Sequence, residues 1–231
     1  MQKIEYKEKP TPHVVVKDFL SIPASRECLE EAQWLEPMYE VASIYESTPN
    51  SIMQKGFRQN KVVYMDEYYH KSRLKSNILQ HVELAIQAPP LLAAFDTFPN
   101  LFPIITQTTH MEAILSSYGK CDFLGWHIDM IPLIPARRIL TGVLHWNTEP
   151  QQYEGGELIL SGETIEDQLA YTPVHNTAIF FESYKCVHAV NEMNYEGEFK
   201  DSRFSLNLWL GFEGHPKTLY NDSENFTNKY R

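Results

Sequence analysis

The sequence contains little cysteine and no sign of a disulfide framework. Its 231 residues include 3 cysteines, Cys28, Cys121 and Cys186, an odd number with no CxxC spacing. This is too few to crosslink a domain of this length, so we expect reduced thiols and a cytoplasmic setting.

Positive charge is also scarce. Twenty Lys and Arg stand against thirty Asp and Glu, which gives a net charge of -10. A surface of this sign repels a nucleic acid backbone and an anionic membrane. We therefore expect neither as a partner.

Long hydrophobic runs are missing as well. The N-terminal segment MQKIEYKEKP has no apolar stretch of the kind a secretory signal needs, and the longest apolar region, 84–95, is interrupted by Pro89 and Pro90. No membrane-spanning helix is expected. A hydrophobic fraction of 43% and an aromatic fraction of 13% exclude disorder, and the nine histidines suggest metal binding or catalysis as the function.

The first hundred residues are predicted to support a core that lies further along the chain. The first ten residues are polar, and we expect them to form a frayed arm. Segment 13–19 is rich in β-branched residues, which predicts a strand. Segment 25–39 predicts a helix after a cap at Ser21 or Ser25. Segment 76–95 predicts a helix that Ser76 caps and the Pro89–Pro90 pair ends.

After Pro99 the sequence consists of short runs of residues that favour β-strands, separated by turn residues. Seven strands are predicted, at 112–118, 126–131, 138–146, 156–160, 177–181, 186–190 and 203–212. This number and spacing favour a closed or two-sheet β core of the jelly-roll class with flanking helices. We predict a single domain over 1–231, with a mixed helical support at 1–100, the β core at 110–212 and a C-terminal tail at 214–231.

A candidate metal site begins at His127 and Asp129 in the segment GWHIDM. On extended backbone, residues two apart project to the same face, so both side chains can reach one ion. His188, at the start of another predicted strand, supplies a third ligand. Two imidazoles and one carboxylate form the facial triad suited to Fe(II), which leaves coordination positions for reactants. The pair alone is also compatible with ordinary surface or core histidines.

A candidate anion site lies in DSRFSLNLWLGF. Period two places Arg203 and Ser205 on one strand face and Phe204 with the leucines on the other. A guanidinium binds a carboxylate through two parallel hydrogen bonds, and a hydroxyl two residues on can add a third. An ion pair between Arg203 and an acidic side chain of the chain itself is the alternative.

In their order along the chain, these motifs resemble the Fe(II)- and 2-oxoglutarate-dependent oxygenases. The further elements Tyr118-Gly119, RxxT from Arg138 in a strand that ends at Asn147, and GGEL at 155–158 resemble the prolyl 4-hydroxylase-like branch, as do Pro173 and AIFF leading to HAV at 188–190. The resemblance covers about residues 110–212. Asn176 departs from it, standing where a glycine is usual, although asparagine also tolerates a left-handed turn.

The resemblance implies a double-stranded β-helix with N-terminal helices packed on its larger sheet. It implies Fe(II) held by His127, Asp129 and His188, with 2-oxoglutarate and O2 as cosubstrates and ascorbate as an optional reductant. Arg203 and Ser205 would bind the distal carboxylate of 2-oxoglutarate, and Tyr118 would assist them. His145 would also assist, at a position where close relatives carry a tyrosine.

The activity implied is hydroxylation of an unactivated C–H bond, with release of succinate and CO2. The substrate class stays open between an amino acid, a small metabolite and an amino-acid residue that is carrier- or peptide-linked. One alternative is a cupin-like Zn or Mn hydrolase or isomerase without 2-oxoglutarate, and another is a non-catalytic interaction module. The cupin-like enzyme would not need Arg203 and Ser205. The complete set of three metal ligands and the anion-binding pair argues against the interaction module. The oligomeric state is not readable from the sequence.

Overall fold

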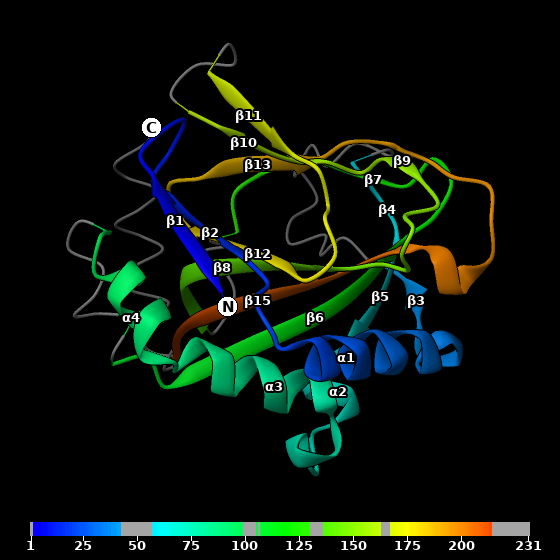
Figure 1. The fold of residues 1–231 in the computed structure, drawn as a ribbon, viewed down its shortest axis with the longest axis horizontal. Coiled ribbons are helices and arrows are strands. Elements are labelled where there is room, and N and C mark those ends of the chain that lie inside the picture. Colours follow the sequence, from blue (N-terminus) through cyan, green and yellow to red (C-terminus); the bar gives the residue numbers. More distant parts are fainter. Residues whose placement is uncertain are drawn as a thin grey trace, which may run out of the picture.

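The computed structural model describes residues 2–42, 57–98, 105, 107–129, 136–162 and 167–213. The predicted tail at 214–231 lies outside the described residues. The chain forms two facing antiparallel sheets with helices below the larger one (Figure 1). No helix of the described part is both long and apolar enough to cross a membrane.

The larger sheet has the strand order β1-β2-β12-β8-β15-β6-β5-β3. Its strands are β1 (Lys3–Lys7), β2 (His13–Lys17), β3 (Glu40–Val41), β5 (Lys61–Tyr64), β6 (His110–Tyr118), β8 (Ala136–Trp146), β12 (Thr177–Glu182) and β15 (Arg203–Glu213). The strand β15 pairs with β6 on one side and β8 on the other, so the end of the predicted core lies in the middle of this sheet.

The smaller sheet lies across the larger one, with the order β11-β10-β13-β7-β4. Its strands are β4 (Arg58–Gln59), β7 (Phe123–His127), β10 (Leu158–Ser161), β11 (Gln168–Tyr171) and β13 (Val187–Val190), and the short pair β9 (Glu154–Gly155) and β14 (Met193–Asn194) adds a ribbon. The predicted jelly-roll class is confirmed by this pair of sheets.

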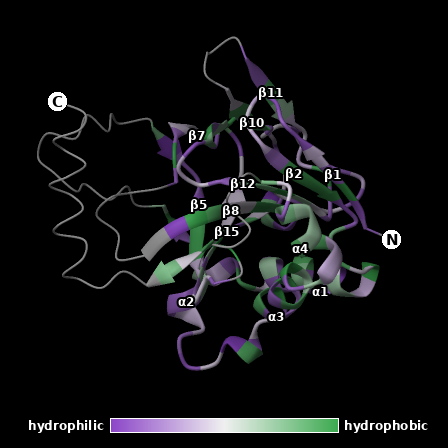
Figure 2. Cartoon of the chain, turned by 90° about the vertical axis from the view of Figure 1, so that its left-hand side faces the viewer, coloured by the Kyte–Doolittle hydropathy of each residue, from purple (hydrophilic) through white to green (hydrophobic). Residues whose placement is uncertain are grey.

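The helices cover the outer face of the larger sheet. They are α1 (Ile22–Trp34), α2 (Met65–Tyr68), α3 (Asn77–Ile86) and α4 (Pro89–Phe95), with 3-10 turns at Glu36–Met38, Arg73–Lys75 and Phe199–Asp201. In Figure 2, α1 and α3 carry both hydrophobic and hydrophilic residues beneath the strands. Both predicted caps form, since the backbone N–H groups of Ala24 and Leu79 donate to the Ser21 and Ser76 hydroxyls.

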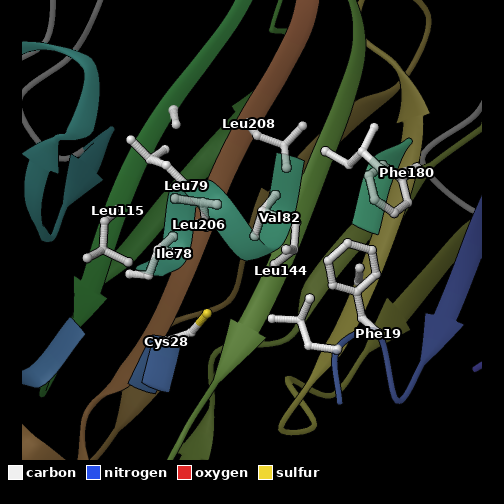
Figure 3. Close-up of a cluster of buried hydrophobic side chains, with 14 of the residues drawn as sticks. Phe19, Cys28, Ile78, Leu79, Val82, Leu115, Leu144, Phe180, Leu206 and Leu208 are labelled. Atoms are coloured by element: carbon white, nitrogen blue, oxygen red, sulfur yellow. The ribbon is translucent and has the colours of Figure 1, made fainter. Parts of the chain in front are cut away.

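The main core fills the space between these helices and the sheet. Figure 3 shows leucines of β6, β8 and β15 facing the apolar side of α3, with Cys28 and Phe19 nearby. Phe204, Leu206 and Leu208 all point into this core and are completely buried. Because side chains alternate along a strand, Arg203 and Ser205 must point the other way, toward the smaller sheet.

Several predictions about local structure were wrong. The N-terminal arm is not frayed, because residues 3–7 form β1 and pair with β2. The single helix predicted over 76–95 is two helices, α3 and α4. The Pro89–Pro90 pair follows the end of α3 and begins α4, since proline suits the first turn of a helix. The predicted strand at 126–131 is observed as β7 and ends at His127, so Asp129 lies beyond the strand.

Glu31 connects two of the supporting helices. It lies in α1, is buried, and accepts hydrogen bonds from the Tyr69 hydroxyl at 2.8 Å and the Ser76 hydroxyl at 2.7 Å. Its second oxygen accepts from the backbone N–H of Ile78 at 2.8 Å. One carboxylate thus accepts hydrogen bonds from donors in the first turn of α3 and holds α1 against that helix.

We expect Glu31→Ala to lower the free energy of unfolding by about 3 kcal/mol, because it leaves buried donors unpaired. The matched control is Glu30→Ala, since Glu30 is exposed and, among the described residues, forms an ion pair with Arg26 alone; it should change stability by less than about 0.5 kcal/mol. Urea denaturation measures both. Equal stability of the two variants would contradict this role of Glu31.

Candidate functional site

The three predicted metal ligands converge between the two sheets. β13 pairs with β7 so that His188 lies directly opposite His127, with ring centroids 4.1 Å apart. The carboxylate of Asp129 reaches both, at 3.5 Å from His127 Nε2 and 3.4 Å from His188 Nε2. One ligand atom from each residue lies within 4.8 Å of the others, which is close enough to share one ion.

Backbone carbonyls fix which nitrogen of each imidazole faces the site. His127 Nδ1 lies 2.8 Å from the carbonyl oxygen of Gly125, and His188 Nδ1 lies 3.2 Å from that of Cys186. A carbonyl only accepts, so Nδ1 of each ring donates and Nε2 of the neutral ring keeps its lone pair. Both Nε2 atoms are thus available as metal ligands.

The charges of the site also suit a divalent cation. Burial alone would raise the pKa of Asp129, but the two imidazoles and a hydrogen bond from Thr141 together hold that pKa well below its ordinary value. Burial lowers the pKa of His188 to about 4. At neutral pH the carboxylate is therefore ionised and His188 is neutral, the protonation states that metal binding requires.

The predicted anion site also lies between the two sheets, on the face of the larger sheet that points toward the smaller one. Arg203 is completely buried, donates from Nη1 to the Ser205 hydroxyl at 3.2 Å, and has its guanidinium carbon 4.6 Å from the centroid of the Tyr118 ring. Within the described part of the chain, its Nε and Nη2 have no hydrogen-bond partner, and Arg203 forms no ion pair. The alternative interpretation, an ion pair between Arg203 and an acidic side chain, is therefore not observed among these residues.

His145 lies beside Arg203 and is equally buried. It is opposite Ser205 in the register of β8 and β15, and neither ring nitrogen has a partner among the described residues. Burial, followed by the charge of Arg203, lowers the pKa of His145 well below its ordinary value. Unpaired buried donors are costly, so this group of side chains fits an anion that would accept from them.

The glycine pair of the GGEL motif gives Arg203 its space. Gly155 and Gly156 both have positive φ, at 79° and 70°. A Cβ added to Gly156 would lie 2.8 Å from Arg203 Cδ and would overlap the sulfur of Met193. The backbone at Gly156 therefore approaches Arg203 closely. Asn176 also has a positive φ, of 57°, as the motif comparison expected.

Three residues around Asp129 were not predicted as part of the site. Thr141 donates to Asp129 Oδ2 at 2.7 Å, the Arg138 guanidinium donates to the backbone oxygen of Asp129, and the backbone N–H of Asp129 donates to Ser183 O. Arg138 and Thr141 are the first and last residues of the RxxT motif, so the sequence pattern could have pointed to them. Nothing in the sequence pattern pointed to Ser183.

A jelly roll that brings two imidazoles and a carboxylate together beside a buried, unpaired guanidinium is typical of non-haem Fe(II) oxygenases. Comparison with known proteins agrees. Residues 113–211 match the model of the 2OG-Fe(II) oxygenase superfamily. An uncharacterized PKHD-type hydroxylase of Synechocystis is 25% identical over 210 residues, which are 87% of this chain and 63% of the relative.

Two solved structures share the fold. A prolyl-4-hydroxylase of Pseudomonas putida has a TM-score of 0.53 at 17% identity, covering 87% of this chain and 92% of that one. A prolyl hydroxylase of Trichoplax adhaerens, in complex with a peptide fragment of hypoxia inducible factor, has a TM-score of 0.63 at 15% identity, covering 86% and 83%.

The match over residues 113–211 agrees with the superfamily that the ordered motifs predicted, and the two prolyl hydroxylase structures share the fold of this chain. The cofactors of this superfamily, Fe(II), 2-oxoglutarate and O2, are those that the sequence implied. The chain spans less than two thirds of the curated relative that it matches.

We expect Gly156→Ala to displace Arg203 and to require left-handed backbone from alanine, so 2-oxoglutarate binding should weaken at least ~10-fold and stability should fall by about 1–3 kcal/mol. Gly119→Ala is the control, because its added Cβ would lie 3.7 Å from its nearest neighbour, an ordinary contact. Calorimetric titration and thermal melting measure both effects. A Gly156→Ala protein that behaves like Gly119→Ala would contradict the close-approach argument.

Proposed function

We propose that the protein is an Fe(II)- and 2-oxoglutarate-dependent oxygenase that hydroxylates an unactivated C–H bond, releasing succinate and CO2. The observation that carries this proposal is the presence, between the same two sheets, of the His127, Asp129 and His188 cluster and of an unpaired buried Arg203. A metal hydrolase would use the first feature and would not need the second. No comparison supports the cupin-like alternative.

In this proposal the two Nε2 atoms and the Asp129 carboxylate hold Fe(II). Three protein ligands leave the remaining positions of an octahedral ion open to reactants. When bound, Fe(II) and 2-oxoglutarate activate O2 for insertion of one oxygen atom into a C–H bond. The work of the protein is to hold these groups in order and to exclude water from them.

Arg203 supplies the positive charge that an acidic protein otherwise lacks. Its Nε and Nη2 form an unpaired edge of the guanidinium, and such an edge binds a carboxylate through two parallel hydrogen bonds. The Nη1 contact with Ser205 and the Tyr118 ring against the guanidinium restrain its orientation. We assign these residues to the distal carboxylate of 2-oxoglutarate.

His145 takes the place of a second hydroxyl donor in this pocket. Because its pKa is lowered, the ring is neutral at physiological pH and offers one N–H. A neutral donor adds a hydrogen bond to the carboxylate without a second positive charge beside Arg203.

The substrate class proposed is an amino acid, free or linked to a carrier or peptide, with a small metabolite as the wider possibility. Both solved neighbours are named as prolyl hydroxylases, and one of them holds a peptide fragment. These names favour a prolyl or similar side chain as the first substrate to screen.

The central experiment is anaerobic titration of the protein with Fe(II) and 2-oxoglutarate. We expect a weak visible charge-transfer band, followed in air by succinate formation in step with the gain of one oxygen by the substrate. Arg203→Ala should raise the 2-oxoglutarate concentration required by at least ~100-fold, because it removes a charge-assisted bidentate contact of ~3 kcal/mol or more.

Fe(II) affinity should be unchanged in Arg203→Ala, while His188→Ala should lose both iron and succinate. Arg26→Ala, which alters an exposed arginine, is the control for loss of charge. Equal loss of iron and 2-oxoglutarate in Arg203→Ala would refute the role given to Arg203. Absence of the band in folded wild-type protein would refute the function.

We expect His145→Phe to raise the KM for 2-oxoglutarate by about 10-fold, since one hydrogen bond of ~1.5 kcal/mol is lost. His145→Gln, which keeps an N–H donor, should recover part of that loss. Steady-state kinetics at saturating substrate measure both variants. If His145→Phe leaves this KM unchanged, His145 is a packing residue and not a cosubstrate ligand.

A further inference from the structure

A cavity lies at the end of the larger sheet, where β5, β6 and the start of β15 meet the turn after β6. Its volume is about 480 Å³, and its other side is lined by residues of the segment 195–202, which includes the 3-10 turn at Phe199–Asp201 (Figure 1). This volume lies within the range of roughly 300–1,000 Å³ that is typical of small-molecule sites. None of the residues assigned above to Fe(II) or 2-oxoglutarate lines the cavity.

Two serines of this cavity are buried, and their hydroxyls have no partner. Ser117 in β6 and Ser202 before β15 are each 3% exposed, and among the described residues neither side chain forms a hydrogen bond. Ser117 alternates with Tyr118 along β6, so its hydroxyl lies on the face of the sheet that points away from Arg203. A buried hydroxyl without a partner is unfavourable, so the two serines fit a polar ligand in the cavity.

The charged groups of the cavity include one cation and one anion that are not paired. Lys120 and Glu196 form an ion pair with each other. Lys61 and Asp122 also line the cavity, and among the described residues neither has an ion-pair partner. The charge of Lys61 acts on the Asp122 carboxyl, yet the two groups do not form an ion pair. The cavity therefore offers separate positions for a negative and a positive group of a ligand.

Asp122 is a carboxylate whose burial is incompletely compensated. Its Oδ2 accepts a hydrogen bond from the backbone N–H of Gly119 at 2.8 Å, and the Gln59 side chain donates another. Burial nevertheless raises the pKa of Asp122, against the effects of these two donors and of the charge of Lys61. A cation beside the carboxylate would stabilise its ionised form, and an ammonium group supplies both the charge and hydrogen-bond donors.

We propose that this cavity binds an α-amino acid as its zwitterion, with the ammonium group at Asp122 and the carboxylate at Lys61. The two serine hydroxyls add hydrogen bonds to the ligand, and the ring of Phe199, which lines the same cavity, offers an apolar surface to its side chain. A ligand with a single charge would leave either Lys61 or Asp122 without a partner. The site uses neither Fe(II) nor 2-oxoglutarate, so this inference goes beyond the proposed function and does not depend on it.

The test is calorimetric titration of the full chain with L-leucine, for which we expect one binding site per chain. Asp122→Asn keeps an acceptor for the Gly119 N–H and removes the charge, so it should weaken leucine binding at least ~10-fold. Lys61→Met, a change at an exposed side chain, should weaken binding in the same way and carries the test if Asp122→Asn does not fold. Isoamylamine, which lacks the carboxylate, and isocaproate, which lacks the ammonium group, should not bind.

Asp18→Asn is the matched control, because Asp18 is exposed and lies outside the cavity lining. Its leucine affinity should equal that of the wild-type protein. A wild-type protein that bound no leucine would overturn the proposal, as would unchanged affinity in both Asp122→Asn and Lys61→Met. Binding of isoamylamine or isocaproate as tight as that of leucine would overturn the assignment of a zwitterion.

His188→Ala separates this site from the metal site. His188 belongs to the candidate metal cluster and does not line the cavity, so its replacement should leave leucine affinity unchanged. Loss of leucine binding in His188→Ala would overturn the proposal, because the amino acid would then bind at the metal site. Leucine binding by a wild-type protein that gave no response to Fe(II) and 2-oxoglutarate would overturn the proposed function alone.

Discussion

The register of β15 is the constraint on which the site depends. This strand lies between β6 and β8 and presents Phe204, Leu206 and Leu208 to the helices, so Arg203 and Ser205 face the smaller sheet. A slip of one residue would exchange the two faces. The leucines and the phenylalanine make such a slip costly, since each is completely buried and burying a side chain of this kind contributes roughly 1.5–3 kcal/mol. The supporting core thereby fixes the direction of the buried charge.

The proposed binding of a dianion by a protein of net charge -10 depends on that buried charge. The global field opposes an anion, but field strength inside a protein depends on local charge and low dielectric constant. Arg203 has no ion-pair partner among the described residues, and the neighbouring His145 is neutral. Among the described residues, the charge of Arg203 is therefore not neutralised by an ion pair. The aromatic residues that first indicated a packed protein also have a local role here, because Tyr118 lies against the guanidinium and shields it from water.

The sequence predicted that His127, Asp129 and His188 would come together, from the residue types and the order of the motifs, and it predicted the jelly-roll class from the short β-rich runs; the structure brings these three side chains together. Strand alternation predicted that Arg203 and Ser205 share a face, and both are buried. The sequence did not predict β1, whose stability comes from pairing with β2 and not from its own polar composition. It predicted that His127 and Asp129 share a face, for the wrong reason: Asp129 follows the end of β7, and contacts from distant residues bring it back. Ser183 and Thr141 are 42 positions apart, and no local pattern reports a contact of that kind.

The candidate metal site depends on contacts with both sheets, and this has a consequence for its rigidity. His127 and His188 belong to paired strands of the smaller sheet, whereas Asp129 is held by Arg138, Thr141 and Ser183 from the larger sheet and its following turn. The three ligands converge only while the sheets keep their separation. Side chains between the sheets, such as Ile179 and Phe181, set that separation, and the Phe181 ring lies 4.7 Å from that of His188. Packing between the sheets is therefore part of the metal site, because a change in core volume there would move the histidines relative to the carboxylate.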